Sequence, residues 1–477
     1  MKKSKQANTP ELEDEADKIS NMPDHVLQLI LSNIPSTEEV IRTSILSTRW
    51  RYLWTSIPFI DIDYTRGLNP LTQFNSNGFR EFVYWVLLNK PLNLDSFHLR
   101  CEYYYNMVTL RQWIHTAVMR KVKLLDLTFC PKEESEDVQI PHSLVTCDSL
   151  EVLKLCLLGS RLCVPNVTGF QALRVLELKE VYLFIDNLVG YFLESCPLLE
   201  DLSLIDCRAG EYVISCSNLK KLRIHTEKLA SVDDDEDDHF DSGDCLDLEI
   251  CCPKLEFLKL TGYVAGNFLF ENLFSLKKAV IHAKDLFIFD EPDFDFFSTI
   301  SHVESLSISL YCISACFDPE VNAPILLPNL KTLEIILDGT NMQALIPFLK
   351  CLPDLDSFHL IIPKHIYRVR KWNLEESETI NILTRHLKKI EFLEFDEEKT
   401  KLDIARVLLE HGNKLEEMEF KWGDEARLHE RSMETMNQVS SFEKASSTVK
   451  LRCSVIDPSQ IDSSPYDKIL DIELIPR

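Results

Sequence analysis

The sequence predicts an α/β solenoid preceded by a small helical block. Three observations lead to this fold class. A short apolar pattern, leucine-x-x-leucine-x-leucine with apolar replacements, recurs at intervals of roughly 20–36 residues, the range of solenoid repeats. Helical apolar stripes precede several copies. The chain, at 477 residues, is also longer than one globular core usually supports.

The composition limits the partners and the compartment. A formal net charge of −25 argues against nucleic acid and against anionic membranes as partners. The polar start, Met1 to Pro10, has no apolar segment of the kind found in secretory signals, and no apolar stretch is long enough to span a bilayer. The 15 cysteines are spread along the chain. We therefore expect reduced, mostly buried thiols in a protein of the cytoplasm, the nucleus or both.

The chain begins with a charged leader, residues 1–17, which we expect to be disordered. A compact apolar block follows at residues 18–58. Asn21 can cap a helix with Pro23 in its first turn, and Pro35 ends it. The apolar stripe of this helix consists of Val26, Leu27, Ile30, Leu31 and Ile34. A second helix is expected around Glu38–Leu46 and a third around Arg49–Trp54. So few residues cannot bury so many large apolar side chains alone.

This block resembles an F-box of the plant type. The family pattern L-P-(D/E)-x-(L/V)-L-x-x-I-L-S-x-L-P, followed by S-x-L-S-(K/R)-R-W-R-x-L-W, fits with three departures: Met22, Ile34 and Thr48. The resemblance implies docking on the Skp-family adaptor of an SCF ubiquitin ligase, and through it on cullin. By motif position, the adaptor-binding residues are Met22, Pro23, Val26, Ile30, Leu31, Ile34 and Pro35, with Leu46, Trp50, Leu53 and Trp54 completing the three-helix unit.

A plainer alternative is a helical cap that seals the first repeat, since solenoids need capped ends. A cap requires only an apolar face. It does not require the Pro-Asp start, the Ile-Leu-Ser step and the Leu-Ser-x-Arg-Trp-Arg run at these spacings, so the F-box interpretation is favoured.

The repeated pattern defines the body of the chain. The copies begin at Leu94, Val122, Leu150, Leu173, Leu199, Leu219, Leu255, Leu276, Val303, Leu330, Leu355, Leu387 and Leu415. Apolar residues two apart lie on one side of a strand. Helical stripes precede the copies at Leu94, Val122 and Leu199. One helix and one short strand cannot bury their apolar faces alone, whereas stacked units form a continuous core beside a parallel sheet.

These units resemble irregular leucine-rich repeats, which we assign to residues 92–363. Leu125-x-Leu127-x-x-Cys130 and Leu202-x-Leu204-x-x-Cys207 match the core of that motif, in which the cysteine faces the interior. The resemblance implies a curved array. The acidic run at 233–244 contains Asp233, Asp234, Asp235, Glu236, Asp237, Asp238, Asp241 and Asp244. We interpret it as a solvated loop rather than a cation site or a docking patch for a basic partner.

The region 385–452 is similar to the FBD region that accompanies F-boxes and leucine-rich repeats in a large plant family. The resemblance rests on Leu387 to Trp422 and on Ser440 to Ser447. A helix carrying Ile404, Val407 and Leu408 should end at Gly412. The segment implies helix–strand units and no chemistry, and the tail at 453–477 is left unassigned.

Motifs of catalysis are not visible. The sequence has no phosphate-binding loop, no dinucleotide fingerprint and no nucleophile elbow. The closest cysteine pairs, Cys251/Cys252 and Cys312/Cys316, lack companions at zinc-ligand spacing, which predicts packed thiols and no metal or cofactor.

Together these features predict a non-catalytic adaptor. The F-box would dock on the Skp adaptor, and the repeats would bind an unknown protein substrate. Two other hypotheses stay open at this point: a repeat protein that binds a partner without a ligase role, and a receptor in which a small molecule sits in the solenoid.

Overall fold

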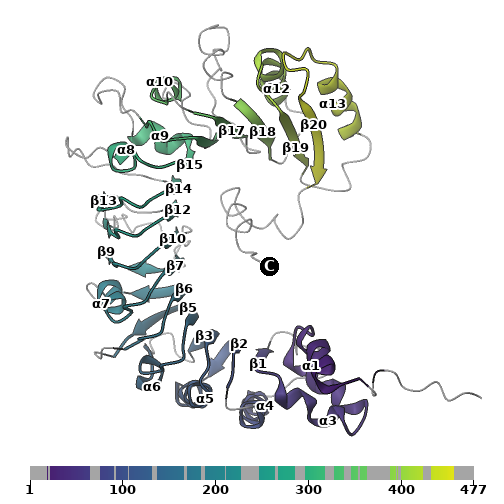
Figure 1. Cartoon of the computed structure of the whole chain (residues 1–477), viewed down its shortest axis with the longest axis vertical. Helices are drawn as coiled ribbons and strands as arrows, with labels where there is room; N and C mark the ends of the chain where they lie inside the picture. The colour runs from purple at the N-terminus through teal and green to yellow at the C-terminus, as the bar shows by residue number, and fades with distance from the viewer. Residues whose placement is uncertain are drawn as a thin grey trace, which may run out of the picture. The chain divides into compact units, whose positions relative to one another are not determined.

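The computed structural model (Figure 1) forms two compact units, unit 1 (Met1–Ala172) and unit 2 (Leu173–Arg477). It describes residues 19, 22–64, 76–90, 93–105, 107–131, 137–165, 169–183, 188–209, 211–226, 247–263, 267–284, 296–316, 327–337, 345–352, 355–362, 387–393, 395, 399–422 and 431–455. The predicted disordered leader, the acidic run 233–244 and the tail beyond residue 455 lie outside these residues.

Unit 1 begins with the predicted helical block. Its elements are α1 (Asp24–Ser32), α2 (Thr37–Arg42), the 3₁₀ helix η1 (Thr43–Ile45), α3 (Trp50–Leu53) and the 3₁₀ helix η2 (Trp54–Ser56). Pro23 occupies the N-cap of α1 rather than its first turn, because its ψ of 149° is extended. Asn21, the predicted cap, lies outside the described residues. The Ser36 side chain accepts a hydrogen bond from Glu39 N and so caps α2.

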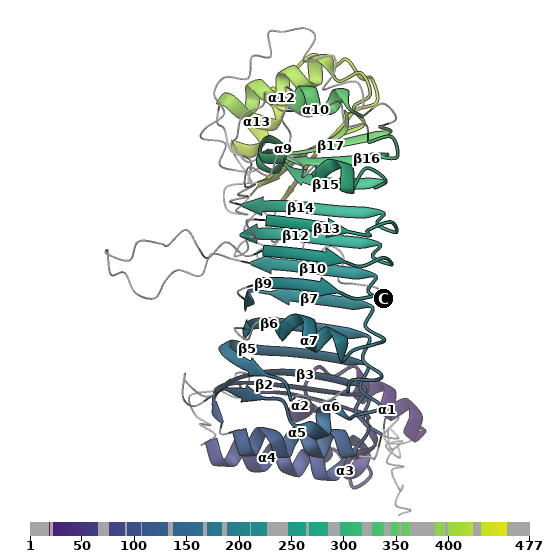
Figure 2. The ribbon, with the colours of Figure 1, turned by 90° about the vertical axis from the view of Figure 1, so that its left-hand side faces the viewer.

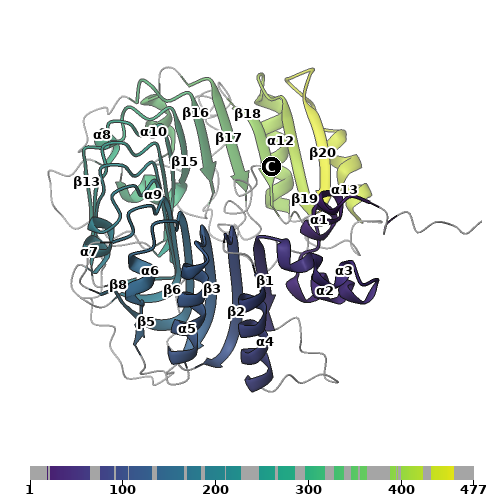
Figure 3. The ribbon, with the colours of Figure 1, turned by 60° about the horizontal axis from the view of Figure 1, so that its bottom comes forward.

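A parallel sheet follows in the same unit. Its elements are β1 (Phe59–Asp63), α4 (Ser76–Asn89), β2 (Ser96–Tyr105), α5 (Met107–Met119), β3 (Leu124–Pro131), β4 (Val138–Gln139), α6 (His142–Val145) and β5 (Val152–Cys163). The main strands pair in the order β1, β2, β3, β5, all parallel. Figure 3 shows α1, α2 and α3 grouped beside β1.

Unit 2 continues the helix–strand pattern. Its elements are β6 (Val175–Leu183), α7 (Leu188–Glu194), β7 (Asp201–Ile205), β8 (Arg208–Ala209), β9 (Glu211–Ser215), β10 (Lys221–Thr226), β11 (Asp247–Cys251), β12 (Phe257–Tyr263), β13 (Asn267–Glu271), β14 (Lys278–Lys284), α8 (Phe296–Thr299), β15 (Ser305–Ser309), α9 (Leu310–Cys316), β16 (Thr332–Ile336), α10 (Leu345–Lys350), β17 (Ser357–Ile362), β18 (Leu387–Phe392), α12 (Lys399–His411), β19 (Glu417–Trp422), α13 (Arg431–Ser440) and β20 (Lys450–Val455).

The main sheet of unit 2 is parallel throughout. Its strands pair in the order β6, β7, β10, β12, β14, β15, β16, β17, β18, β19, β20. Figure 1 shows these strands side by side along the inner side of a bend, with α7, α8 and α12 on the outer side. This arrangement confirms the predicted α/β solenoid with its parallel sheet.

Each predicted copy of the repeat pattern lies at one strand of these two sheets. The two apolar residues inside each strand point into the core; Leu222, Ile224, Leu258 and Leu260, for example, are at most 1% exposed. Burial of each such side chain contributes about 1.5–3 kcal/mol. Cys207 is buried as the motif implies, and its thiol donates to the carbonyl of Leu178 at 3.3 Å.

The outer layer differs from the expected helices in one stretch of unit 2. Here β9, β11 and β13 form a second parallel sheet (Figure 2). Tyr212 and Ile214 on β9, like Leu248 and Ile250 on β11, are buried at alternate positions, which is the period of a strand. β9 also follows β7 and precedes β10 within a few residues, so the connection there is too short to hold a helix.

The C-terminal part of unit 2 consists of helix–strand units, as the FBD resemblance implies. α12 ends at His411, and Gly412 N donates to Leu408 O at 2.9 Å, which confirms the predicted helix end. Phe392, Phe395, Phe420 and Trp422 pack as a group, with centroids 4.8–5.4 Å apart. None of the described helices is long and apolar enough to cross a lipid bilayer.

Candidate functional site

The helical block at residues 22–56 has an internal framework. Leu27, Leu31, Trp50, Leu53 and Trp54 are all at most 8% exposed. Four of the predicted site residues therefore lie inside the block. Leu31 is fully buried, so it holds α1 in place and offers no surface to another protein. Trp50, Leu53 and Trp54 complete the packing, as expected.

The same block also leaves five large apolar side chains exposed to solvent, which we call together the F-box face. They are Leu29, Ile30, Ile45, Leu46 and Tyr52, and they are 63%, 42%, 88%, 62% and 69% exposed. Of the other predicted residues, Pro23 and Pro35 are exposed, and Met22, Val26 and Ile34 are half-buried.

Two assignments change in this structure. Leu31, predicted to contact the adaptor, is fully buried, and Leu46, expected to complete the helical packing, is exposed. Leu29, Ile45 and Tyr52 had not been predicted. Leu29 follows Val26 by three residues, so helical spacing places the two on one side of α1 and could have identified it.

The F-box face stands out from the rest of the described surface. Thirteen large apolar residues are exposed among the described residues, and six of them lie between Ile19 and Tyr52. Concentrated exposed apolar surface is the usual mark of a protein–protein contact. A helical cap needs one apolar face, and the buried framework already supplies it. The F-box face is therefore not explained by capping.

Two motif residues outside the F-box face, Asp24 and Arg49, form an ion pair with each other. Arg49, just before α3, donates from Nε to Asp24 Oδ1 at 3.0 Å, joining the start of α3 to the start of α1. Both residues are exposed in part. Their role is to hold two short helices together, since neither helix is long enough to be stable alone.

The block is anchored to the first strand and helix of unit 1. Asp61 N on β1 donates to Thr37 Oγ1 at 2.8 Å. Lys90, just after α4, donates from Nζ to the carbonyls of Trp54 (2.8 Å) and Ile57 (3.1 Å). Burial lowers the pKa of Lys90 to about 7. This lysine, which sequence reasoning missed, ties the end of the block to the first repeat.

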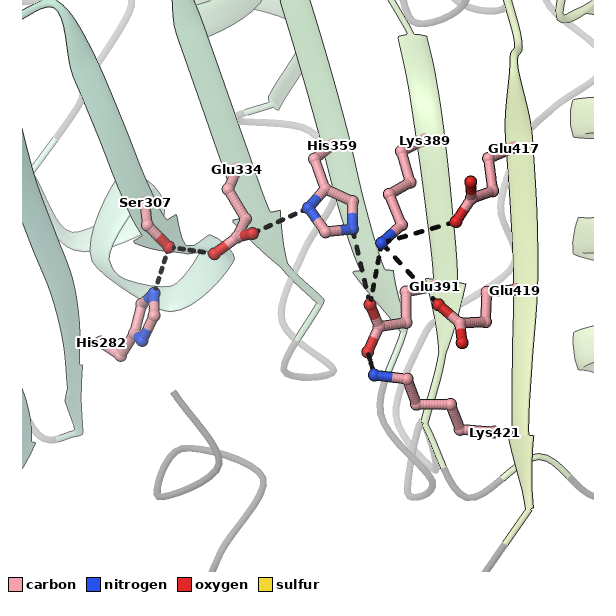
Figure 4. Close-up of polar contacts among 9 residues, drawn as sticks. All are labelled: His282, Ser307, Glu334, His359, Lys389, Glu391, Glu417, Glu419 and Lys421. Carbon is pink, nitrogen blue, oxygen red and sulfur yellow. Dashed lines mark hydrogen bonds and ion pairs between the residues drawn. The ribbon is translucent and has the colours of Figure 1, made fainter. Parts of the chain in front are cut away.

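A second group of polar residues lies on one face of the main sheet in unit 2 (Figure 4). We call it the polar row. At its first end, Ser307 Oγ donates to Glu334 Oε1 at 2.6 Å, and His282 Nε2 lies 2.8 Å from Ser307 Oγ. Glu334 Oε2 accepts from His359 Nδ1 at 2.8 Å. Because the single hydroxyl proton of Ser307 goes to Glu334, His282 Nε2 must be the donor to Ser307.

The polar row continues across the next strands as ion pairs. His359 Nε2 lies 3.9 Å from Glu391 Oε2, and Lys421 Nζ lies 2.5 Å from Glu391 Oε1. Lys389 lies 3.7–3.8 Å from carboxylate oxygens of Glu391, Glu417 and Glu419. These side chains come from β14 to β19. Only the parallel register brings them together, so no local motif could have identified them.

Burial shapes the charges at the first end of the polar row. It lowers the pKa of His282 to about 4, so this imidazole is neutral near pH 7. Burial also opposes the charge of Glu334, but the hydrogen bond and charge of His359, with smaller contributions from Ser307 and His282, outweigh it and lower the pKa of Glu334 to about 2. The result is a fixed carboxylate held between two imidazoles.

Two buried cysteines of unit 2 carry thiols that are protonated near neutral pH. Burial raises the pKa of Cys196 and of Cys252 to about 12, which makes these thiols poor nucleophiles. Within the described ranges, no three histidine, cysteine or acidic residues are placed to share a metal ion.

Comparison with known proteins gives consistent results. Residues 19–61 match the F-box domain family, and residues 88–452 match the family described as the At1g61320/AtMIF1 LRR domain. The putative F-box/FBD/LRR-repeat protein At1g66290 of Arabidopsis thaliana is 29% identical over 416 residues, which cover 83% of this chain and 85% of that protein. The FBD-associated F-box protein At1g66310 of Arabidopsis thaliana is 30% identical over 369 residues, covering 74% and 78%.

A third relative extends nearly from end to end. The F-box/FBD/LRR-repeat protein At1g78750 of Arabidopsis thaliana is 28% identical over 463 residues, covering 90% of this chain and 95% of that protein.

Proposed function

The chain belongs to the plant family of F-box/leucine-rich-repeat/FBD proteins, and on that basis we propose that it is the substrate-receptor subunit of an SCF-type ubiquitin ligase. In this role the F-box binds a Skp-family adaptor and through it cullin, and the repeats bind a protein substrate. The chain itself catalyses nothing. It accelerates ubiquitin transfer by holding the substrate close to the loaded conjugating enzyme, in the cytoplasm, the nucleus or both.

The observation that carries this proposal is the F-box face. Its five side chains are exposed although the block already has a complete buried framework. Burying each large apolar side chain against an adaptor would contribute about 1.5–3 kcal/mol, so a few of them suffice for a stable complex. The predicted residues Met22, Pro23, Val26, Ile30, Ile34 and Pro35 are all accessible at least in part and surround the same helix.

The substrate would bind one face of the repeat strands. In unit 2 this face carries the polar row, in which Lys389, His359 and Glu334 are accessible at least in part. Charged groups fixed by neighbouring strands give a partner a rigid pattern to match, which favours selectivity over affinity.

Co-purification with a plant Skp adaptor tests the proposal. The variant Leu29→Asp/Ile30→Asp places two carboxylates on the F-box face, where both side chains are exposed in the isolated chain. The fold should therefore tolerate them. In the complex they would be buried without partners, which costs several kcal/mol, so adaptor binding should weaken at least tenfold.

Two controls sharpen this experiment. Phe274→Asp changes an exposed apolar residue outside the F-box and should leave adaptor binding unchanged. Leu31→Asp should instead unfold the block, because Leu31 is fully buried, and would lose binding for that trivial reason. If the wild-type chain does not bind the adaptor, or if Leu29→Asp/Ile30→Asp binds as well as the wild type, the adaptor proposal fails.

A further inference from the structure

One position of the repeat pattern carries an alternating charge, which we call the charge ladder. It is the residue directly after the first apolar residue of each copy. Its members, in chain order, are Asp95, Lys123, Glu151, Arg174, Glu200, Lys220, Glu256, Lys277, Glu304, Lys331, Asp356, Lys388 and Glu416. Every copy is charged, and the sign reverses at every step.

Composition does not account for this pattern. Only 27% of the residues are charged, and acidic residues outnumber basic ones by 76 to 51. A random position would be charged in a minority of copies and would favour the acidic sign. The charge ladder is instead fully charged and nearly balanced in sign.

The backbone stacks successive members of the charge ladder on one another. In unit 2, Glu200 N donates to Arg174 O, Lys220 N to Glu200 O and Glu256 N to Lys220 O, each at 2.8 Å. The same bond continues at 2.9–3.0 Å through Lys277, Glu304, Lys331 and Asp356. It recurs between Lys388 and Glu416 (2.9 Å), and in unit 1 between Lys123 and Glu151 (2.8 Å). Neighbouring charges are therefore one strand spacing apart.

Side chains bridge these steps. Glu200 accepts from Arg174 Nη1 at 2.7 Å with one carboxylate oxygen and from Lys220 Nζ at 2.9 Å with the other. Lys123 Nζ lies 2.8 Å from Asp95, and Lys277 Nζ lies 3.5 Å from Glu256. Exposed ion pairs of this kind stabilise a fold little. A role in specificity fits the alternation better.

The buried strand positions distinguish one repeat from another only weakly, because each copy presents two similar apolar residues there. Repeats that skip a neighbour could therefore still bury these strand residues. The charge ladder distinguishes these cases: adjacent repeats carry opposite signs, and repeats two apart carry the same sign. Like charges on directly neighbouring strands repel.

We propose that the charge ladder is a pairing code, which lets each repeat stack beside its own neighbours and rejects a skipped repeat, whether it comes from the same chain or from a second copy of it. In β20 the register places Lys450 opposite Glu417, so the position opposite Glu416 is the uncharged Val449. The code therefore ends at Glu416, the member that precedes β19.

Refolding from denaturant at low ionic strength tests the code. Glu200→Lys would place three cations in succession. We expect its monomer yield, measured by size-exclusion chromatography with light scattering, to fall at least twofold in 20 mM salt and to recover in 0.5 M salt, where the charges are screened. Glu194→Lys makes the same charge change at an exposed position of α7 off the ladder and should refold like the wild type. Equal yields for Glu200→Lys and Glu194→Lys in low salt would overturn the proposal.

A charge-inversion rescue covers the case in which Glu200→Lys does not fold at either salt concentration. Glu416→Lys creates a like charge with Lys388, whereas Lys388→Glu/Glu416→Lys exchanges the two signs and makes them opposite again. Asp356 does not lie opposite Lys388, because the register shifts between β17 and β18, so the exchange creates no new stacked pair of like charges there. The single variant should show the salt-dependent loss, and the double variant should recover at least half of the lost yield. A double variant as defective as the single one would contradict a pairing code.

Discussion

Leu29 and Leu31 lie two residues apart on α1, yet one is 63% exposed and the other is fully buried. The difference follows from the 100° turn per helical residue, which places them on different sides of the helix. Lys90 shows the same dependence on surroundings. Its side-chain nitrogen is buried against the F-box, where it donates to the carbonyls of Trp54 and Ile57.

Lys90 should give the chain a pH-dependent stability that Lys90→Met lacks. The folded pKa of about 7 lies below the unfolded value of 10.5, so between these values the unfolded chain binds more protons. Stability from this group therefore rises with pH across that window and is lost as pH falls toward 7. Between pH 7 and pH 9.5, we expect the unfolding free energy of the wild type to rise by about 3 kcal/mol relative to that of Lys90→Met.

Urea denaturation at the two pH values measures this shift. The variant should be less stable than the wild type at pH 9.5, because methionine removes the hydrogen bonds that Lys90 Nζ donates to the carbonyls of Trp54 and Ile57. A free-energy difference that stays the same at both pH values would show that Lys90 has an ordinary pKa in the folded chain.

At the scale of elements, the repeat strands are defined by what they bury and by how closely they approach one another. β12 contains Gly262, whose φ of +82° belongs to the left-handed region. An added Cβ there would lie 2.1 Å from the carbonyl oxygen of Thr226 on β10. The close pairing of β10 with β12 thus depends on a residue without a side chain.

Gly262→Ala should therefore weaken unit 2 by about 2–4 kcal/mol, because both the backbone conformation and the contact with Thr226 become unfavourable. Thermal or chemical unfolding measures the loss. Lys221→Ala, an exposed change on β10, is the matched control and should alter stability by no more than about 0.5 kcal/mol. A Gly262→Ala variant that unfolds like this control would mean that the two strands can separate at no cost.

At the scale of the whole molecule, the thirteen cysteines among the described residues are free thiols, so they contribute no disulfide to stability. We attribute the stability of the solenoid to apolar stacking. We expect the melting temperature to change by less than about 1 °C when dithiothreitol is added. A native disulfide typically contributes 2–5 kcal/mol. A clear fall in melting temperature under reduction would reveal a disulfide and contradict the predicted reducing compartment.

Much of this fold could be predicted from local patterns. The F-box motif, the thirteen repeat positions and the helix end at Gly412 all depend on residues a few positions apart. The family comparison confirms the first, and the structure confirms the other two. The outer strands β9, β11 and β13 were missed because their short alternating segments resemble loops when the neighbouring strands are unknown. The predicted adaptor-binding residues proved to be partly buried and partly exposed. The motif identifies which residues belong to the F-box, but their exposure depends on how the helices pack.

The short-range spacing of apolar residues is enough to identify an F-box followed by leucine-rich repeats in this chain. The folded chain alone reveals which apolar residues stay exposed on the F-box face and which lysine anchors the block. It also reveals how His282, Glu334, His359 and Glu391 meet on one sheet. Exposure and polar contacts depend on strands far apart in the chain. Their proximity comes from stacking, which no local pattern specifies.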